Sequence, residues 1–257
     1  MADGGKYNFE RRSAASGERS SNKMRALVVS DSRGAGISRQ VNRNQKLATL
    51  KKVRVDIRIL PGATLRELRN AIANANAFHS YQLIIVVGGI CDLTVKSQYD
   101  KLNILEYPAH DPDKVVGEFI LLRDEFGDKI IFSTISPASL VKYTKVKNNI
   151  ECLPRELENR LTTSQVKLVQ DLEYINSWIK EDNKQSHCTN LDHSKFTTSC
   201  SIKKPLQGQK YRKEKFSDKN LYDGLHANSE LKTKWHQRTT DVIFQEMNKR
   251  FFLGRAD

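Results

Sequence analysis

The feature that most constrains the fold is a repeated alternation between short apolar runs and segments with helical spacing of apolar residues. The apolar runs occupy residues 24–31, 53–59, 83–87 and 129–133. Apolar residues recur every three or four positions, as in a helix, over residues 64–78, 115–122 and 164–180. Strands that alternate with helices need crossover connections, which favour a parallel sheet with helices on both faces. The sequence therefore predicts an α/β fold, with one body over residues 24–252.

The side chains within each run indicate where its strand lies in the sheet. Residues 83–87 are apolar on both faces, which is typical of a central strand. Residues 53–59 alternate between aliphatic and charged side chains, which predicts a half-exposed strand near an edge. Thr64 and Glu67 have the spacing of a capping box, so a helix is expected to begin at that point.

Positive charge is concentrated in two regions of this chain, whose net charge is +13. Residues 1–60 hold 14 Lys or Arg against 5 Asp or Glu, and residues 203–219 hold 7 against 2. Such regions attract polyanions through phosphate contacts and counterion release, although many basic surfaces are only solvated. Residues 1–23 contain few large apolar side chains, so we expect them to form a mobile basic tail.

Several classes of protein are not expected. No segment approaches the roughly 20 apolar residues of a membrane span, and the first residues lack the apolar core of a signal peptide. We therefore expect an intracellular protein, cytoplasmic or nuclear. The four cysteines form no CxxC pair, which favours reduced thiols. His187, Cys188, His193 and Cys200 lack the spacing of a compact zinc knuckle, so a flexible loop is favoured over a metal site.

Candidate catalytic residues follow the ends of the predicted strands. Asp31 and Ser32 come directly after the first run, where a serine suits either helix capping or chemistry at the sheet edge. Asp223 and His226 lie just before the last predicted helix. A serine hydroxyl becomes nucleophilic when a histidine removes its proton, and a carboxylate holds that histidine in the correct tautomer. Gly34 begins a dinucleotide-binding pattern that fails at Arg39, and no cofactor is expected.

Four blocks in this order resemble those of the SGNH, or GDSL-type, hydrolases over roughly residues 24–252. The blocks are Asp31-Ser32, Gly62, Gly89-Ile90-Cys91-Asp92 and Asp223-Gly224-Leu225-His226. The resemblance implies a flavodoxin-like three-layer α/β/α sandwich with a mostly parallel five-stranded sheet, and hydrolysis of a small acyl ester. It implies Ser32 as nucleophile, His226 as base and Asp223 as the orienting carboxylate. It also implies that the backbone N–H groups of Ser32 and Gly62 bind the oxyanion.

The chain departs from the family pattern near the expected oxyanion hole. Ser30 stands where a glycine is usual, and Cys91 stands where the family has an asparagine that supplies the third oxyanion donor. A thiol is a weak donor, so the rate could fall by about 100-fold. Arg33 follows the nucleophile and either binds an anionic substrate or compensates for the lost donor. Asp92 is a second candidate substrate contact.

A basic loop insertion is expected at about residues 183–220, and it leads to an alternative function. In this alternative, residues 24–252 form a catalytically weak or inactive scaffold, and the protein binds RNA or DNA through its basic segments. The same chain resembles, more weakly, esterase-like proteins of invertebrate mobile elements. Plain solubility would also explain this charge, and the sequence predicts no oligomeric state. The candidate nucleic-acid contacts are Lys203, Lys204, Lys210, Tyr211, Arg212, Lys213 and Lys215.

Overall fold

The computed structural model describes residues 24–38, 41, 53–75, 78–108, 111–203 and 211–253, with only the backbone described for 78, 198–203, 211–215 and 251–253. The predicted tail, residues 1–23, lies outside the described residues.

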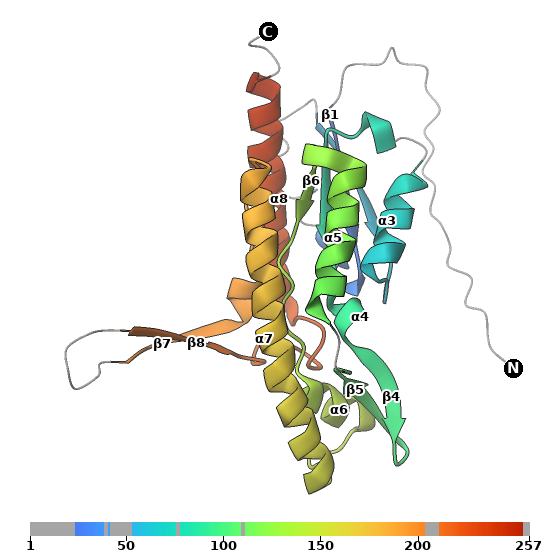
Figure 1. Cartoon of the computed structure of the whole chain (residues 1–257), viewed down its shortest axis with the longest axis vertical. Coiled ribbons are helices and arrows are strands. Elements are labelled where there is room, and N and C mark those ends of the chain that lie inside the picture. The colour runs from blue at the N-terminus through green and yellow to red at the C-terminus, as the bar shows by residue number, and fades with distance from the viewer. Residues whose placement is uncertain are drawn as a thin grey trace, which may run out of the picture.

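Four parallel strands form the central sheet, in the order β2-β1-β3-β6 (Figure 1). They are β1 (Met24–Ser30), β2 (Val53–Ile59), β3 (Leu83–Val87) and β6 (Ile130–Phe132). Ser30 of β1 pairs with Ile59 on one side and with Val87 on the other, so three strands end level with one another. Strand β3 is buried along its whole length and β2 is a partly exposed edge strand, as predicted.

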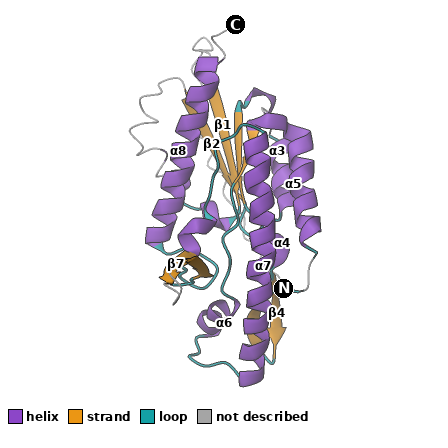
Figure 2. Cartoon of the chain, turned by 60° about the vertical axis from the view of Figure 1, so that its left-hand side comes forward, coloured by secondary structure: helices purple, strands orange, loops and turns teal. Residues whose placement is uncertain are grey.

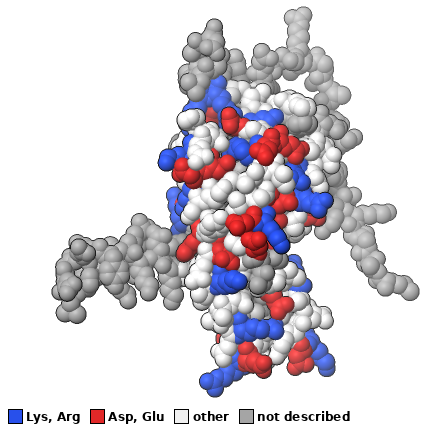
Figure 3. Space-filling view, in the orientation of Figure 1, with Lys and Arg blue, Asp and Glu red and all other residues white. Residues whose placement is uncertain are grey.

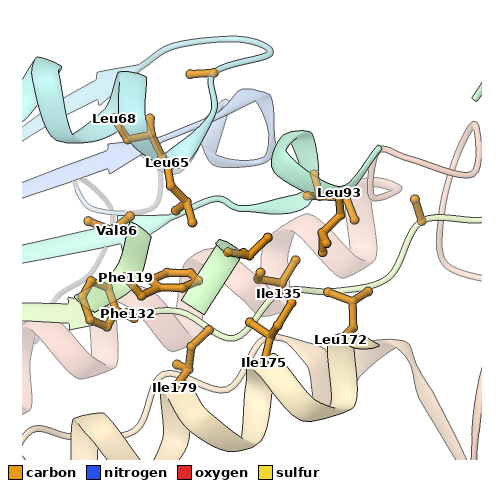
Figure 4. Close-up of a cluster of buried hydrophobic side chains, with 14 of the residues drawn as sticks. Leu65, Leu68, Val86, Leu93, Phe119, Phe132, Ile135, Leu172, Ile175 and Ile179 are labelled. Atoms are coloured by element: carbon orange, nitrogen blue, oxygen red, sulfur yellow. The ribbon is translucent and has the colours of Figure 1, made fainter. Parts of the chain in front are cut away.

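Helices cover both faces of this sheet and form the predicted three-layer sandwich (Figure 2). One face packs against α3 (Leu65–Ala73), α5 (Pro112–Phe126) and α7 (Arg155–Gln185), in a core that Figure 4 shows in part. The other face packs against α8 (Ser229–Leu253). Successive residues of β1 alternate between the two cores, Leu27 toward the first and Val28 toward the second. Burial of each such side chain stabilises the fold by about 2 kcal/mol.

The expectation of a five-stranded sheet is wrong for the described residues, because side chains of α7 and not a fifth strand cover the outer edge of β6. The side-chain amide of Asn183 accepts from the N–H of Phe132 and donates to its C=O. Asn176 makes the same pair of bonds with Ile135. A single parallel bridge from Ser133 to Leu191 stands beside them. Two asparagines of α7 therefore satisfy backbone groups that a fifth strand would otherwise pair with.

The helices differ from their predicted lengths. Helix α3 begins with the expected capping box of Thr64 and Glu67 but ends at Ala73. Helix α7 extends well beyond the predicted range 164–180 at both ends. No described helix is both long enough and apolar enough to cross a membrane.

Additional elements follow the strands at the carboxyl end of the sheet. Helix α4 (Ile90–Leu93) leads into an antiparallel hairpin of β4 (Val95–Tyr99) and β5 (Leu102–Glu106). Both residues of its turn, Asp100 and Lys101, have positive φ, as a tight two-residue hairpin requires. Helix α6 (Leu140–Asn148) packs on β5, and these elements extend below the sheet with the first half of α7 (Figure 1).

The segment expected to be a flexible polar loop contains regular structure. Strands β7 (Thr198–Lys203) and β8 (Tyr211–Phe216) form an antiparallel hairpin that projects from the body in Figure 1. Lys204 and Lys210 lie outside the described residues, and the other candidate nucleic-acid contacts are described by backbone alone. On the face drawn in Figure 3, basic and acidic side chains are mixed. The prediction of nucleic-acid binding therefore rests on the sequence alone.

Candidate active site

In the turn after β1, Asp31 and not Ser32 caps the helix that follows. Asp31 is the N-cap of a short 3-10 helix, Ser32–Gly34, and its Oδ1 accepts the backbone N–H of Arg33 at 2.8 Å. Because Asp31 supplies the capping oxygen, the hydroxyl of Ser32 is free to point elsewhere. Ser32 is half-buried at the end of the strand, while Asp31 is fully buried.

Three side chains from the predicted blocks come together at this edge of the sheet. Ser32 Oγ lies 3.1 Å from Nε2 of His226, a residue 194 positions away in the chain. His226 Nδ1 lies 2.8 Å from Asp223 Oδ2. Asp223 Oδ1 accepts the backbone N–H of His226 at 2.7 Å, so one carboxylate fixes both the ring and its backbone. The His226 side chain is 34% exposed, which leaves it accessible from solvent.

The electrostatics of Asp223 suit the role of an orienting carboxylate. Burial alone would raise its pKa, but hydrogen bonds from His226 and from the backbone of Leu225 hold the pKa below its ordinary value. Asp223 is therefore ionised at neutral pH and favours the His226 tautomer that carries its proton on Nδ1. In that tautomer Nε2 is free to accept the proton of Ser32.

Helix α6, which the sequence analysis missed, holds the loop that carries His226. The backbone N–H of Ser139 donates to Gly224 C=O at 2.6 Å, and Ser139 Oγ donates to Asp218 at 2.8 Å. Gly224 has φ +83°, and a Cβ there would lie 2.4 Å from the backbone N of Tyr143. Only glycine allows this approach. Pro137 and Ser139 ahead of an apolar run are a helix-start signal that could have revealed α6.

Two backbone N–H groups are available for an oxyanion hole. Leu60 to Ala63 form a hydrogen-bonded turn with Pro61 second and Gly62 third, and Gly62 has φ +79°, as a type II turn requires. Leu60 N–H donates to Ser30 C=O at 2.8 Å, which fixes this turn beside the nucleophile strand. Within the described part of the chain, the N–H groups of Ser32 and Gly62 have no acceptor.

Cys91, at the expected position of the third donor, is the second residue of α4. Burial raises the pKa of its thiol to about 11, so the thiol stays protonated at neutral pH. A protonated thiol is a poor nucleophile, which argues against Cys91 as the attacking group. It keeps one weak S–H donor near the site.

The two predicted substrate contacts, Arg33 and Asp92, are buried or engaged in the structure. The Arg33 side chain turns inward and the residue is only 6% exposed. Both carboxylate oxygens of Asp92 accept the backbone N–H of Leu65, at 3.1 and 3.0 Å. Asp92 therefore joins α4 to the start of α3, and burial raises its pKa to about 7.

A second serine–histidine pair lies inside the molecule, and the sequence analysis missed it. Ser133 Oγ lies 2.8 Å from Nδ1 of His193, whose Nε2 bonds Thr239 Oγ1 at 3.1 Å. Burial lowers the pKa of His193 to about 3, so its ring is neutral. Both ring nitrogens are occupied by hydroxyls, and Ser133 and His193 are 1% and 4% exposed. This pair has neither a carboxylate partner nor access for a substrate.

The comparisons with known proteins bear on the fold. No model of a protein family matches the chain, and no curated protein matches it in sequence. Among solved structures it is similar to a GDSL-like lipase from Bacteroides thetaiotaomicron, with TM-score 0.53 and 13% identity over 88% of each chain. It is also similar to the lipase/acylhydrolase from Enterococcus faecalis, with TM-score 0.52 and 16% identity over 88% of this chain and 97% of that chain. The chain has an SGNH hydrolase-like fold.

That fold agrees with the architecture that the sequence resemblance implied. Each of the four sequence blocks lies next to a different element of this fold. Ser32 follows β1, Gly62 follows β2 and Cys91 follows β3, whereas His226 precedes α8. Similarity at this level of identity concerns the backbone arrangement.

Proposed function

We propose that the chain is a serine esterase that hydrolyses a small acyl ester, with Ser32 as nucleophile, His226 as general base and Asp223 as the carboxylate that orients it. The observation that supports this proposal best is the continuous relay from Ser32 Oγ through both ring nitrogens of His226 to Asp223, with links of 3.1 and 2.8 Å. These distances suit direct proton transfer. The reaction needs no metal or cofactor.

The reaction would proceed in two steps through an acyl-enzyme. Ser32 Oγ bonds to the acyl carbon while its proton passes to His226 Nε2 and the carbonyl π electrons move onto the oxygen. Collapse of this intermediate expels the alcohol, which leaves with the proton from His226. Water then attacks the acyl-enzyme and gives a proton to His226. Release of the carboxylic acid returns that proton to Ser32.

The oxyanion of each tetrahedral intermediate would be bound by backbone N–H groups of Ser32 and Gly62. Each well-aimed donor contributes on the order of 3 kcal/mol to the stability of the transition state. With a thiol in place of an amide at Cys91, we expect a slower enzyme than one with three strong donors.

Replacement of the nucleophile tests the proposal. In Ser32→Ala, hydrolysis of p-nitrophenyl acetate and labelling by a fluorophosphonate probe should fall to background, while the melting temperature changes little because Ser32 is half-buried. The same substitution at Ser133 is the matched control, since it removes a hydroxyl that also lies beside a histidine. Ser133→Ala should keep turnover and labelling at temperatures where it is folded. Unchanged turnover in Ser32→Ala would end the proposal.

A further inference from the structure

Arg33 is a buried cation that follows the candidate nucleophile directly in the chain. Its Nη1 donates to the C=O of Ser136 at 2.5 Å, and its guanidinium lies 5.9 Å from the ring centroid of Trp235. Its Nε and Nη2 are buried and have no hydrogen-bond partner among the described residues. It also lines a cavity of about 10 Å³ with Thr134 and His193. That volume suits one water molecule and is too small for an acyl group, so a substrate does not reach the guanidinium.

The charge of Arg33 is poorly compensated. Within the described ranges, no carboxylate oxygen lies within 4.0 Å of its guanidinium nitrogens. Asp31 has the largest electrostatic influence on it among the acidic groups, but burial raises the pKa of Asp31 and so disfavours its charged form. A buried charge without a partner is expensive, and an apolar side chain of similar length would often be more stable at such a position. Stability alone therefore does not account for an arginine here.

The field of this charge reaches the groups around the candidate oxyanion hole. Arg33 adjoins Ser32 in the same short helix, and its charge acts on both Cys91 and Asp223. Burial is the main cause of the raised pKa of the Cys91 thiol, the charge of Asp31 adds to that rise, and the Arg33 charge opposes it. Negative charge near Cys91 is therefore favoured by Arg33, and solvent screens the Arg33 charge only weakly because this residue is buried.

We propose that the positive charge of Arg33 stabilises the negative charge that develops on the substrate carbonyl oxygen, in partial replacement of the third strong donor that Cys91 does not supply. This inference rests on the proposed esterase function. Arg33 acts through space and does not touch the substrate, so it should affect the chemical step more than substrate binding.

A series at this one position separates charge from anchoring. Arg33→Met removes the charge and the hydrogen bonds, Arg33→Gln removes the charge but keeps donors, and Arg33→Lys keeps the charge. We expect kcat for p-nitrophenyl acetate to fall about 10- to 100-fold in the first two, with KM within about twofold of wild type. Arg33→Lys should stay within about threefold. The melting temperature of Arg33→Met should be unchanged or higher.

Arg123 offers a matched control, because it is a partly buried arginine whose charge is paired with a carboxylate. It pairs with Asp182 at 2.6 Å, and its guanidinium lies 5.0 Å from the Phe132 centroid. Arg123→Met should lower the melting temperature and leave kcat and KM unchanged, the opposite of Arg33→Met.

The alternative outcomes separate this inference from the proposed function. If the wild type is inactive, the proposed function fails first and this inference with it. If the wild type is active and Arg33→Met keeps its kcat, only this inference fails. If Arg33→Lys and Arg33→Met lose equal activity and both melt earlier, Arg33 is a structural anchor and the electrostatic role is overturned. If Arg33→Met does not fold, the comparison of Arg33→Gln with Arg33→Lys decides.

Discussion

Two serine–histidine pairs in this molecule have similar geometry and opposite surroundings. The pair at the sheet edge, Ser32 and His226, is 3.1 Å apart, whereas the internal pair, Ser133 and His193, is 2.8 Å apart. The shorter contact belongs to the pair that no substrate can reach. A short distance between hydroxyl and imidazole is therefore a poor guide to catalysis, because the surroundings decide what the histidine can do.

What differs is the partner on the far ring nitrogen and the access to solvent. His226 Nδ1 faces an ionised carboxylate, which stabilises the imidazolium that forms when Ser32 gives up its proton. His193 Nε2 faces the hydroxyl of Thr239, which offers no such charge. With a pKa of about 3, His193 is too weak a base to take a proton from serine at neutral pH.

The internal pair nevertheless supports the turn that carries Ser32. His193 C=O accepts hydrogen bonds from Ser136 Oγ and from Trp235 Nε1, both at 3.2 Å. Ser136 C=O in turn accepts from Arg33, the residue after the candidate nucleophile. Hydrogen bonds from the internal pair therefore reach the side chain of the residue next to Ser32 in the chain, while the edge pair is the candidate for chemistry.

The largest effect on kcat that tests this comparison is expected from substitution of the carboxylate beside each histidine. In Asp223→Asn, Oδ1 can still accept the backbone N–H of His226, but the amide NH₂ would face His226 Nδ1 and force the proton onto Nε2. The base would then point a proton at Ser32, so kcat should fall by about 10⁴-fold. Asp192→Asn is the control beside the other histidine, since Asp192 bonds Thr134, Ser194 and Lys180. It should leave kcat unchanged, and a similar loss in both variants would contradict the distinction.

Much of the fold follows from local sequence patterns. Strands β1, β2 and β3 and the start of α3 could be predicted because each is defined by its own run of side chains or its own cap. The fourth strand of the sheet, β6, is two residues shorter than predicted. Asn183 of α7 satisfies the outer backbone groups of Phe132, and Asn176 does the same for Ile135 beyond the strand. That arrangement depends on residues more than 40 positions away, and no local pattern contains it.

The candidate site was predictable in part for a similar reason. Ser32, Asp223 and His226 lie at strand ends or before a helix, where sequence order alone predicts their position. The inward turn of Arg33 was not predictable, because it depends on Ser136 and Trp235 from distant elements. The support of Gly224 by α6 was missed because α6 itself was not recognised.

A smaller effect on kcat is expected at Cys91, which lies where the third oxyanion donor of the edge pair is expected. Cys91→Asn replaces a weak thiol donor with an amide, the donor that SGNH-type hydrolases have there. We expect kcat for p-nitrophenyl acetate to rise about 10- to 100-fold, because one strong donor contributes a factor of this order or more. Cys152→Asn is the control, since Cys152 is exposed. No gain in Cys91→Asn would mean that position 91 does not face the oxyanion.

The smallest effect concerns the internal pair and appears in stability rather than in rate. His193 has a pKa of about 3 when folded and an ordinary value near 6.5 when unfolded. As pH falls below about 6.5, His193 therefore binds a proton in the unfolded chain but stays neutral in the folded chain. This difference reduces the free energy of unfolding. Asp92 has the opposite sign, because its folded pKa of about 7 lies above its unfolded value, so acidification over this window stabilises the fold.

His193→Gln removes the first of these contributions and keeps polar atoms for Ser133 and Thr239. Relative to wild type, its free energy of unfolding should improve by about 2 kcal/mol between pH 7 and pH 5, since each pH unit below the unfolded pKa costs about 1.4 kcal/mol. Urea denaturation at several pH values measures this difference, and Asp92→Asn should shift the same curve the other way. Turnover of folded His193→Gln should match wild type. If its pH dependence of stability equals that of wild type, His193 is not the buried neutral histidine that the contrast with His226 requires.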